Sequence, residues 1–157
     1  MKRDFIEYLS RFVGKGSTVL DAGCGSGEFL RELVELTGAR GLGVDPYSPG
    51  RGEGTLEFRS LPAERIGELK GKFDLVYTVH SLHHFRDVEK FLQGALDVLE
   101  DEGQLVIIDW IKGADTGVPE DYFTLEEVVG LMEKAGFEIQ EKYIVGDSFV
   151  VRGRRKA

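Results

Sequence analysis

The sequence has little cysteine, no long apolar run and no excess of basic residues. The single cysteine, Cys24, cannot form an internal disulfide, and it excludes a zinc site built from several cysteines. No apolar run approaches the roughly 20 residues that cross a bilayer, and the first residues lack the apolar stretch of a signal peptide. The formal net charge of -8 disfavours binding to phosphate backbones. We therefore expect a cytoplasmic protein with no membrane partner, for which nucleic acid is a disfavoured partner.

The 157 residues, of which 41% are hydrophobic and 31% charged, suit one domain (1–157) with a single core. Short β-branched runs alternate with longer segments of helical period, which predicts an α/β fold with a doubly wound sheet. The expected strands cover residues 17–21, 41–45, 55–59, 73–79, 104–109, 137–145 and 148–152. The expected helices cover residues 4–13, the segment from the first glycine run to Gly38, and residues 62–69, 87–99 and 124–135.

A glycine-rich turn follows the first expected strand and reads Asp21-Ala22-Gly23-Cys24-Gly25-Ser26-Gly27. Glycine lets a ligand approach the backbone closely, and the start of the next helix offers unpaired N–H groups. The G-x-G-x-G spacing after an acid differs from the G-x-G-x-x-G of pyrophosphate binders. It favours a ligand without phosphate that carries a cationic centre, whereas a purely structural turn is the alternative.

A second acid, Asp45, ends the next expected strand. A carboxylate at this place can accept hydrogen bonds from both hydroxyls of a ribose. The two features together indicate a nucleoside ligand.

With these features the chain resembles the class I, Rossmann-like S-adenosylmethionine-dependent methyltransferases. The matching segments, in the order of the family, are residues 19–27, 43–45, 73–76, 81–87 and 98–105, and the turn at 135–137 is similar too. The resemblance implies S-adenosylmethionine as cofactor, S-adenosylhomocysteine as product, and methyl transfer by in-line displacement. It also implies a three-layer fold with helices on both faces of a seven-stranded, mostly parallel sheet, of order 3-2-1-4-5-7-6 with strand 7 antiparallel.

The resemblance further implies which residues bind the cofactor. The loop residues would face its methionine part, Asp45 would hold the ribose, and the backbone around Thr78 would meet the amino-acid group. The run Leu61-Pro62-Ala63-Glu64 departs from the family, which often has an Asp before the Ala, so the Ala63 amide and the Glu64 carboxylate are alternatives for binding adenine. The full implied set is Asp21, Ala22, Gly23, Cys24, Gly25, Asp45, Pro46, Leu61, Pro62, Ala63, Thr78 and His84.

Three histidines follow the fourth expected strand. His83 or His84 is the candidate general base for a hydroxyl or amine acceptor, because imidazole titrates near neutral pH. The i, i+3, i+4 spacing of His80, His83 and His84 suits a metal site, but Asp87 is the only carboxylate evident nearby in the sequence, so we expect no metal. Cys24 is interpreted as a packing residue.

The methyl acceptor is not specified by any motif. We expect a small molecule, with an aromatic wall formed by Phe5, Tyr8, Trp110, Tyr122 and Phe123, the last two from the long connection 111–123. An NAD-dependent oxidoreductase of Rossmann type and a noncatalytic methyltransferase-like subunit of a complex are the alternatives. The chain is expected to be a monomer or a homodimer.

Overall fold

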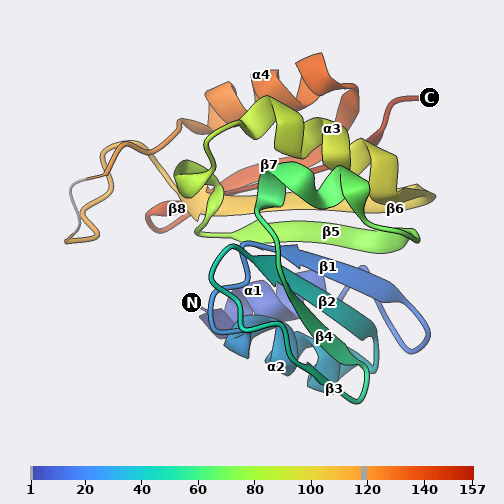
Figure 1. The fold of residues 1–157 in the computed structure, drawn as a ribbon. Coiled ribbons are helices and arrows are strands. Elements are labelled where there is room, and N and C mark those ends of the chain that lie inside the picture. The colour runs from blue at the N-terminus through green and yellow to red at the C-terminus, as the bar shows by residue number, and fades with distance from the viewer. Residues whose placement is uncertain (1, 118–119) are drawn as a thin grey trace.

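A computed structural model of the protein describes residues 2–117 and 120–157, and it shows one sheet between two layers of helices (Figure 1). Helices α1 and α2 cover one face, whereas α3, α4 and the 3-10 helix η1 cover the other. The helices are α1 (Lys2–Leu9), α2 (Glu28–Thr37), η1 (Ala63–Glu68), the short 3-10 helix η2 (Leu82–His84), α3 (Val88–Val98) and α4 (Leu125–Ala135). The strands are β1 (Thr18–Ala22), β2 (Arg40–Asp45), β3 (Gly52–Glu53), β4 (Leu56–Ser60), β5 (Phe73–Val79), β6 (Leu99–Trp110), β7 (Phe137–Val145) and β8 (Ser148–Arg155).

The order of the strands is β3-β4-β2-β1-β5-β6-β8-β7. Strands β4, β2, β1, β5 and β6 are parallel, and β8 is antiparallel to both β6 and β7. Without β3, this is the predicted order 3-2-1-4-5-7-6 with an antiparallel strand 7, so the predicted fold class is confirmed. Seven strands were predicted, and the described residues form eight, because Gly52 and Glu53 pair antiparallel with β4. Two residues without an apolar side chain carry no periodic signal from which this strand could be predicted.

The core lies on both faces of the sheet because the central strands alternate their side chains. In β1, Leu20 faces the layer of η1, α3 and α4, and its neighbour Val19 faces α1 and α2. In β5, Val76 likewise faces the layer of η1, α3 and α4, and Leu75 faces α1 and α2. Successive side chains of a strand point to opposite faces of the sheet. Because helices cover both faces here, the central strands need apolar residues at every position.

Several element boundaries differ from the expected ones. Helix α1 begins at Lys2 and ends at Leu9, whereas residues 4–13 were expected. The chain leaves the helix because Ser10 Oγ donates to the Glu7 carbonyl (2.6 Å) and the Arg11 N–H donates to the carbonyl three residues back (3.2 Å). The helix expected at 62–69 is the shorter 3-10 helix η1 (Ala63–Glu68). Strand β4 lies one residue later than expected, and β6 and β8 are longer than expected.

Helix α4 begins as its sequence predicts. The Thr124 side chain accepts a hydrogen bond from the Glu127 N–H (3.1 Å), and the Glu127 carboxylate accepts one from the Thr124 N–H (2.9 Å). This reciprocal cap satisfies two N–H groups at the helix start and fixes where the connection from β6 ends.

None of the helices formed by residues 2–117 and 120–157 is long and apolar enough to cross a membrane.

Candidate active site

The predicted site residues lie at the carboxyl ends of neighbouring parallel strands. The glycine loop follows β1, Asp45 ends β2, the histidines follow β5, and Asp109 lies near the end of β6. Ligands of open α/β sheets bind at this edge, because the loops and helix starts converge there. The topology therefore brings together groups that are up to about 90 residues apart in the sequence.

The glycine loop is held against β2 and has little room for side chains. The N–H groups of Gly23 and Cys24 both donate to the Val44 carbonyl, at 2.8 and 3.0 Å. Gly23 has a φ of +84°, and a Cβ there would lie 2.8 Å from the Ser81 Cβ. Gly25 also has a positive φ, +54°, but a Cβ there would meet no atom within 4 Å. Gly23 is thus required by a close approach between two segments, whereas Gly25 lies open toward solvent.

Asp45 is oriented by two backbone N–H groups. Its Oδ2 accepts from Gly25 (3.1 Å) and its Oδ1 accepts from Tyr47 (2.9 Å). A carboxylate has about four lone-pair sites, so both oxygens retain capacity for further donors. Asp45 is therefore a fixed acceptor suited to the hydroxyls of a ligand.

Two cavities meet at this edge of the sheet. The larger, of about 840 Å³, lies beside Asp45, Pro46, Pro62, Ala63 and His84. The smaller, of about 510 Å³, is lined by the glycine loop from Gly23 to Ser26 and by the aromatic side chains of Phe5, Phe29, His80 and Trp110. Gly23 and Ser81 belong to both, so one elongated ligand can span them.

Some predicted cofactor residues lie beneath the cavities instead of lining them. Asp21 is 3% exposed and accepts a hydrogen bond from the Tyr77 hydroxyl (2.8 Å). Burial raises the pKa of Asp21 to about 7, the nearby Asp45 charge adds to the rise, and the Tyr77 hydrogen bond opposes it. Ala22 is fully buried, and Leu61 is half-buried with its N–H donating to the Asp45 carbonyl (3.1 Å).

Thr78 is fully buried in β5, and its hydroxyl has no hydrogen-bond partner among the described residues. The residues that follow it, from Val79 to Ser81, reach the smaller cavity. Cys24 also lines this cavity, but it is nearly buried. Burial, together with the charges of Asp21 and Asp45, raises the pKa of Cys24 to about 12. Its side chain is a neutral thiol near neutral pH and a poor nucleophile.

His80 does not join the other two histidines. Its ring stacks on Trp110, with the ring centres 3.9 Å apart, and its Nε2 lies 2.9 Å from the Ser148 hydroxyl. Burial lowers the pKa of His80 to about 4, and the neighbouring His83 contributes to the shift. His80 also has a φ of +54°, which is unfavourable for a residue with a Cβ and is typical of functional sites. It is a neutral, flat wall of the smaller cavity.

His83 is held by a buried carboxylate. Asp109 is fully buried, and its two oxygens lie 2.9 and 3.0 Å from the His83 Nδ1. Asp109 also accepts from the backbone N–H groups of His83 (3.0 Å) and Trp110 (2.8 Å). Burial raises the pKa of Asp109, while its hydrogen bonds to His83 and Trp110 oppose the rise. The His83 ring is 4% exposed, and the Tyr122 ring packs edge-on against it at 4.8 Å.

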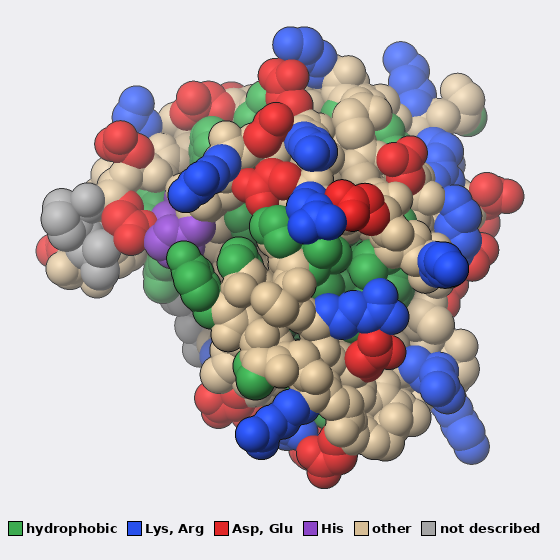
Figure 2. Space-filling model, viewed as in Figure 1, with side chains coloured by type: hydrophobic (Ala, Val, Ile, Leu, Met, Phe, Trp, Pro, Cys, Tyr) green, Lys and Arg blue, Asp and Glu red, His purple; other side chains and the backbone are tan. Residues whose placement is uncertain are grey.

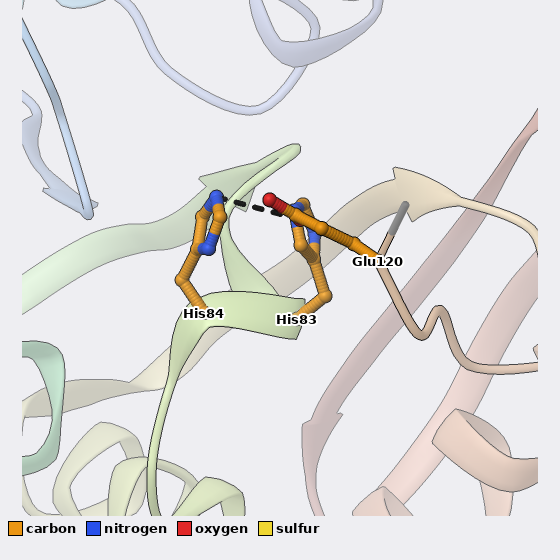
Figure 3. A group of neighbouring side chains, drawn as sticks. All are labelled: His83, His84 and Glu120. Atoms are coloured by element: carbon orange, nitrogen blue, oxygen red, sulfur yellow. Dashed lines mark ion pairs between the residues drawn. The ribbon is translucent and has the colours of Figure 1, made fainter. Parts of the chain in front are cut away.

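The other nitrogen of His83 faces the loop between β6 and α4. Figure 3 shows Glu120 reaching from that loop toward both imidazole rings. Its Oε2 lies 2.7 Å from His83 Nε2 and 3.9 Å from His84 Nε2. His84 is exposed and also borders the larger cavity.

Two carboxylates near the histidines, Asp109 and Glu120, were not predicted from the sequence as their partners. Asp87, which was considered as a partner of the histidines, instead accepts from the Lys90 N–H and caps α3. Asp109 lies at the carboxyl end of β6, and its bond to His83 was not predicted. Glu120 lies in a connection whose path depends on tertiary packing, so no local signal identifies it.

The expected aromatic wall is also only partly formed. Phe5 and Trp110 line the smaller cavity, and Tyr122 contacts His83. Tyr8 instead packs against Phe12 and donates to the Glu141 carboxylate (2.7 Å), on the side of α1 near β7. Phe123 packs against the core formed with α3 and α4.

Comparison with known proteins identifies the family. The family described as methyltransferase domain matches residues 1–142. The chain belongs to this family. The predicted resemblance to the class I S-adenosylmethionine-dependent methyltransferases is thereby confirmed, and neither the oxidoreductase nor the noncatalytic alternative is supported.

Individual relatives agree with the family. The 2-methyl-6-phytyl-1,4-hydroquinone methyltransferase of Synechocystis sp. is 30% identical over 135 residues, which are 78% of this chain and 42% of that protein. The ubiquinone biosynthesis O-methyltransferase of Rhizobium rhizogenes is 30% identical over 102 residues, 59% of this chain and 41% of that protein. The chain thus spans less than half the length of these two relatives.

A solved structure has the same fold. The 1,6-didemethyltoxoflavin-N1-methyltransferase of Burkholderia thailandensis, crystallised with its didemethyltoxoflavin and S-adenosylhomocysteine, has a TM-score of 0.82 and 22% identity. The match covers 99% of this chain and 78% of that one.

Proposed function

We propose that this methyltransferase domain transfers the methyl group of S-adenosylmethionine to a small-molecule acceptor and releases S-adenosylhomocysteine. The observation that carries the proposal is the pair of cavities that meet at Gly23 and Ser81, with Asp45 in one and the glycine loop in the other. Their arrangement suits a ligand with a nucleoside at one end and an amino acid at the other.

The adenosine part occupies the larger cavity. Asp45 accepts hydrogen bonds from the ribose hydroxyls, and adenine packs between Pro46 and Pro62, which both line this cavity. The Glu64 Oε2 already accepts from the N–H groups of Arg86 (2.6 Å) and Asp87 (3.3 Å). The Glu64 Oε1 keeps its capacity to accept, so we assign both the Ala63 N–H, at the start of η1, and the Glu64 carboxylate to adenine.

The methionine part occupies the smaller cavity, above the loop from Asp21 to Gly25. The sulfonium is a cation, and the Asp45 carboxylate gives this end of the sheet a negative character that favours it. The backbone of Val79 and His80, directly after Thr78, borders the amino-acid end.

The acceptor is a small molecule with a hydroxyl group on a ring. Two relatives act, by their names, on a hydroquinone and in O-methylation for ubiquinone biosynthesis. The stacked His80 and Trp110 rings give the smaller cavity a flat wall that suits a planar molecule. Nucleic acid is a poor acceptor, because the net charge is -8 and the face in Figure 2 intersperses basic with acidic side chains.

The reaction is an in-line displacement in which the domain mainly positions the acceptor oxygen behind the methyl carbon. Such positioning supplies roughly 7–11 kcal/mol of barrier reduction. His84, which borders the cofactor cavity, and His83, oriented by Asp109, are the side chains that we assign to preparing the acceptor oxygen.

Cofactor binding tests the first part of the proposal. We expect S-adenosylhomocysteine, but not NAD, to raise the melting temperature of the purified chain. Asp45→Asn should weaken S-adenosylhomocysteine binding by about 10- to 100-fold, as lost hydrogen bonds to a charged group do. Glu35→Gln, an exposed change on α2, serves as the control and should leave binding unchanged. Stabilisation by NAD alone would contradict the proposal.

Turnover tests the second part. With labelled S-adenosylmethionine and a set of ring-hydroxylated acceptors, we expect label in an acceptor ether, and a strong loss of rate when His83 and His84 are both changed to alanine. An unchanged rate in that double variant would remove the two histidines from the reaction. Circular dichroism of the variant separates a lost reaction from a lost fold.

A further inference from the structure

The cluster of His83, His84 and Glu120 has the composition of a metal site. One imidazole nitrogen from each histidine and one carboxylate oxygen of Glu120 all lie within 4.8 Å of one another (Figure 3). The closest pair, His83 Nε2 and Glu120 Oε2, is 2.7 Å apart. Residues 83 and 84 come from η2, and residue 120 comes from the connection after β6, so the cluster depends on the fold.

The hydrogen bonds behind His83 determine what its exposed nitrogen can do. The buried Asp109 carboxylate lies 2.9 Å from Nδ1 and can only accept there, which places a proton on Nδ1. In the neutral form of the ring, the lone pair of Nε2 then faces the Glu120 oxygen. Two acceptors at 2.7 Å repel each other unless a proton or a cation lies between them.

The Asp109 carboxylate also orients the His83 ring in the way that a residue behind a metal ligand does. Metal-bound histidines almost always donate their second ring N–H to a carboxylate, a carbonyl or water, and this contact fixes the tautomer. Asp109 is itself fixed by the N–H groups of His83 and Trp110. His83 as a candidate metal ligand and Asp109 as the residue that orients it are therefore both present.

We propose that His83, His84 and Glu120 bind one divalent transition-metal cation of the Zn²⁺ class. Two imidazoles and one carboxylate suit Zn²⁺ and its neighbours, whereas Mg²⁺ and Ca²⁺ prefer oxygen ligands. This differs from the expectation of no metal, because the sequence does not show that Glu120 lies near the histidines. Ligand atoms around a tetrahedral Zn²⁺ are about 3.3 Å apart. The Glu120 carboxylate, which is 30% exposed, therefore withdraws slightly from His83 when the cation enters.

Three protein ligands leave one position of the cation open, and His84 borders the cofactor cavity. At this position the cation binds the acceptor hydroxyl and lowers its pKa, and the proton passes to solvent water. The resulting oxygen anion forms a bond to the methyl carbon, and the electron pair of the carbon–sulfur bond remains on sulfur as a neutral thioether. This catalytic role rests on the proposed function, whereas cation binding rests only on the geometry of the cluster.

Cation binding is tested on the full chain without any acceptor. We expect dialysis against ZnCl₂, after treatment with EDTA, to load one Zn²⁺ per chain. His84→Ala and Glu120→Ala should each weaken Zn²⁺ binding by at least 10-fold, and Asp109→Asn by about 10- to 100-fold. Asp121→Asn, an exposed carboxylate next to Glu120, is the matched control and should bind Zn²⁺ as the unchanged chain does. Substoichiometric loading, or loading that survives His84→Ala and Glu120→Ala, would overturn the proposal.

Activity distinguishes the two proposals from each other. We expect EDTA to lower methyl transfer and ZnCl₂ to restore it, while S-adenosylhomocysteine still binds to the EDTA-treated chain. A rate that EDTA leaves unchanged would overturn the catalytic role of the cation and leave the histidines as a general base. Failure of the chain to bind S-adenosylhomocysteine would instead contradict the proposed function, and it would leave the proposal of Zn²⁺ binding unaffected.

Discussion

At the scale of single residues, the glycine loop covers a carboxyl group that solvent does not reach. Asp21 follows the buried residues Val19 and Leu20 in β1, and its carboxylate accepts a hydrogen bond from the Tyr77 hydroxyl. Removal from water disfavours its charged form, and one hydrogen bond from a neutral group does not offset this cost. The pKa of Asp21, about 7 in place of 3.8, is the result.

The raised pKa predicts how Asp21 affects stability. Between about pH 4 and pH 7 the folded chain keeps a proton on Asp21 that the unfolded chain loses, so raising the pH across this range lowers the free energy of unfolding. Asp21→Asn keeps an acceptor for Tyr77 and has no such proton. We expect the variant to gain stability relative to the unchanged chain as the pH rises, by at most about 4 kcal/mol above pH 7.

Urea unfolding at about pH 5 and about pH 8 measures this difference. Glu35→Gln, on the exposed side of α2, is the control and should show the same pH dependence as the unchanged chain. A difference between Asp21→Asn and the unchanged chain that does not vary with pH would show that Asp21 ionises normally in the folded state.

At the scale of elements, the turn between β1 and α2 depends on two glycines for different reasons. Gly23 lies where the loop passes the end of β5, and Ser81 Oγ donates to its carbonyl (3.0 Å). Gly25 has a similar backbone conformation but faces open space. Substitutions at the two positions therefore distinguish the cost of the left-handed backbone conformation from the cost of crowding.

We predict that Gly23→Ala lowers the free energy of unfolding by about 2–5 kcal/mol, through the left-handed conformation and the collision with Ser81. Gly25→Ala should cost only about 1–2 kcal/mol, through the left-handed conformation alone. Chemical denaturation of both variants provides the comparison. Equal losses would mean that Ser81 can move aside and that crowding does not explain Gly23.

At the scale of the whole molecule, the last strand lies inside the sheet. The family match ends at residue 142, yet β8 pairs with β6 on one side and β7 on the other. Phe149, Val150 and Val151 of β8 are fully buried. The segment that follows the family match therefore completes the core.

We predict that a chain ending at residue 142 does not fold, because the long strand β6 loses β8, one of its two partners, and both layers of the core are opened. A chain ending at Arg155 loses one hydrogen bond, from the Lys156 N–H to the Gly136 carbonyl, and should stay within about 1 kcal/mol of the full chain. Far-ultraviolet circular dichroism and thermal unfolding measure both. A cooperative transition in the shorter chain would show that β8 is dispensable.

The strands, the helices and the glycine loop were predictable because their signals are local. The capping box at Thr124 and Glu127 and the glycine spacing after Asp21 each lie within a few contiguous residues. The strand order followed from the resemblance to a family, since side-chain periodicity alone does not say which strands pair. The edge strand β3 was missed because its two residues carry no periodic pattern.

The sequence by itself determined the element types, the glycine loop and the acid at the end of β2, because each depends on neighbours along the chain. Only the tertiary structure decided which carboxylates meet the histidines. Asp109 reaches His83 because β5 and β6 are adjacent and parallel, and Glu120 reaches it through the connection after β6. Tertiary packing likewise turned His80 toward Trp110, away from His83. Such contacts depend on where distant segments cross, and no period or spacing in the sequence encodes that crossing.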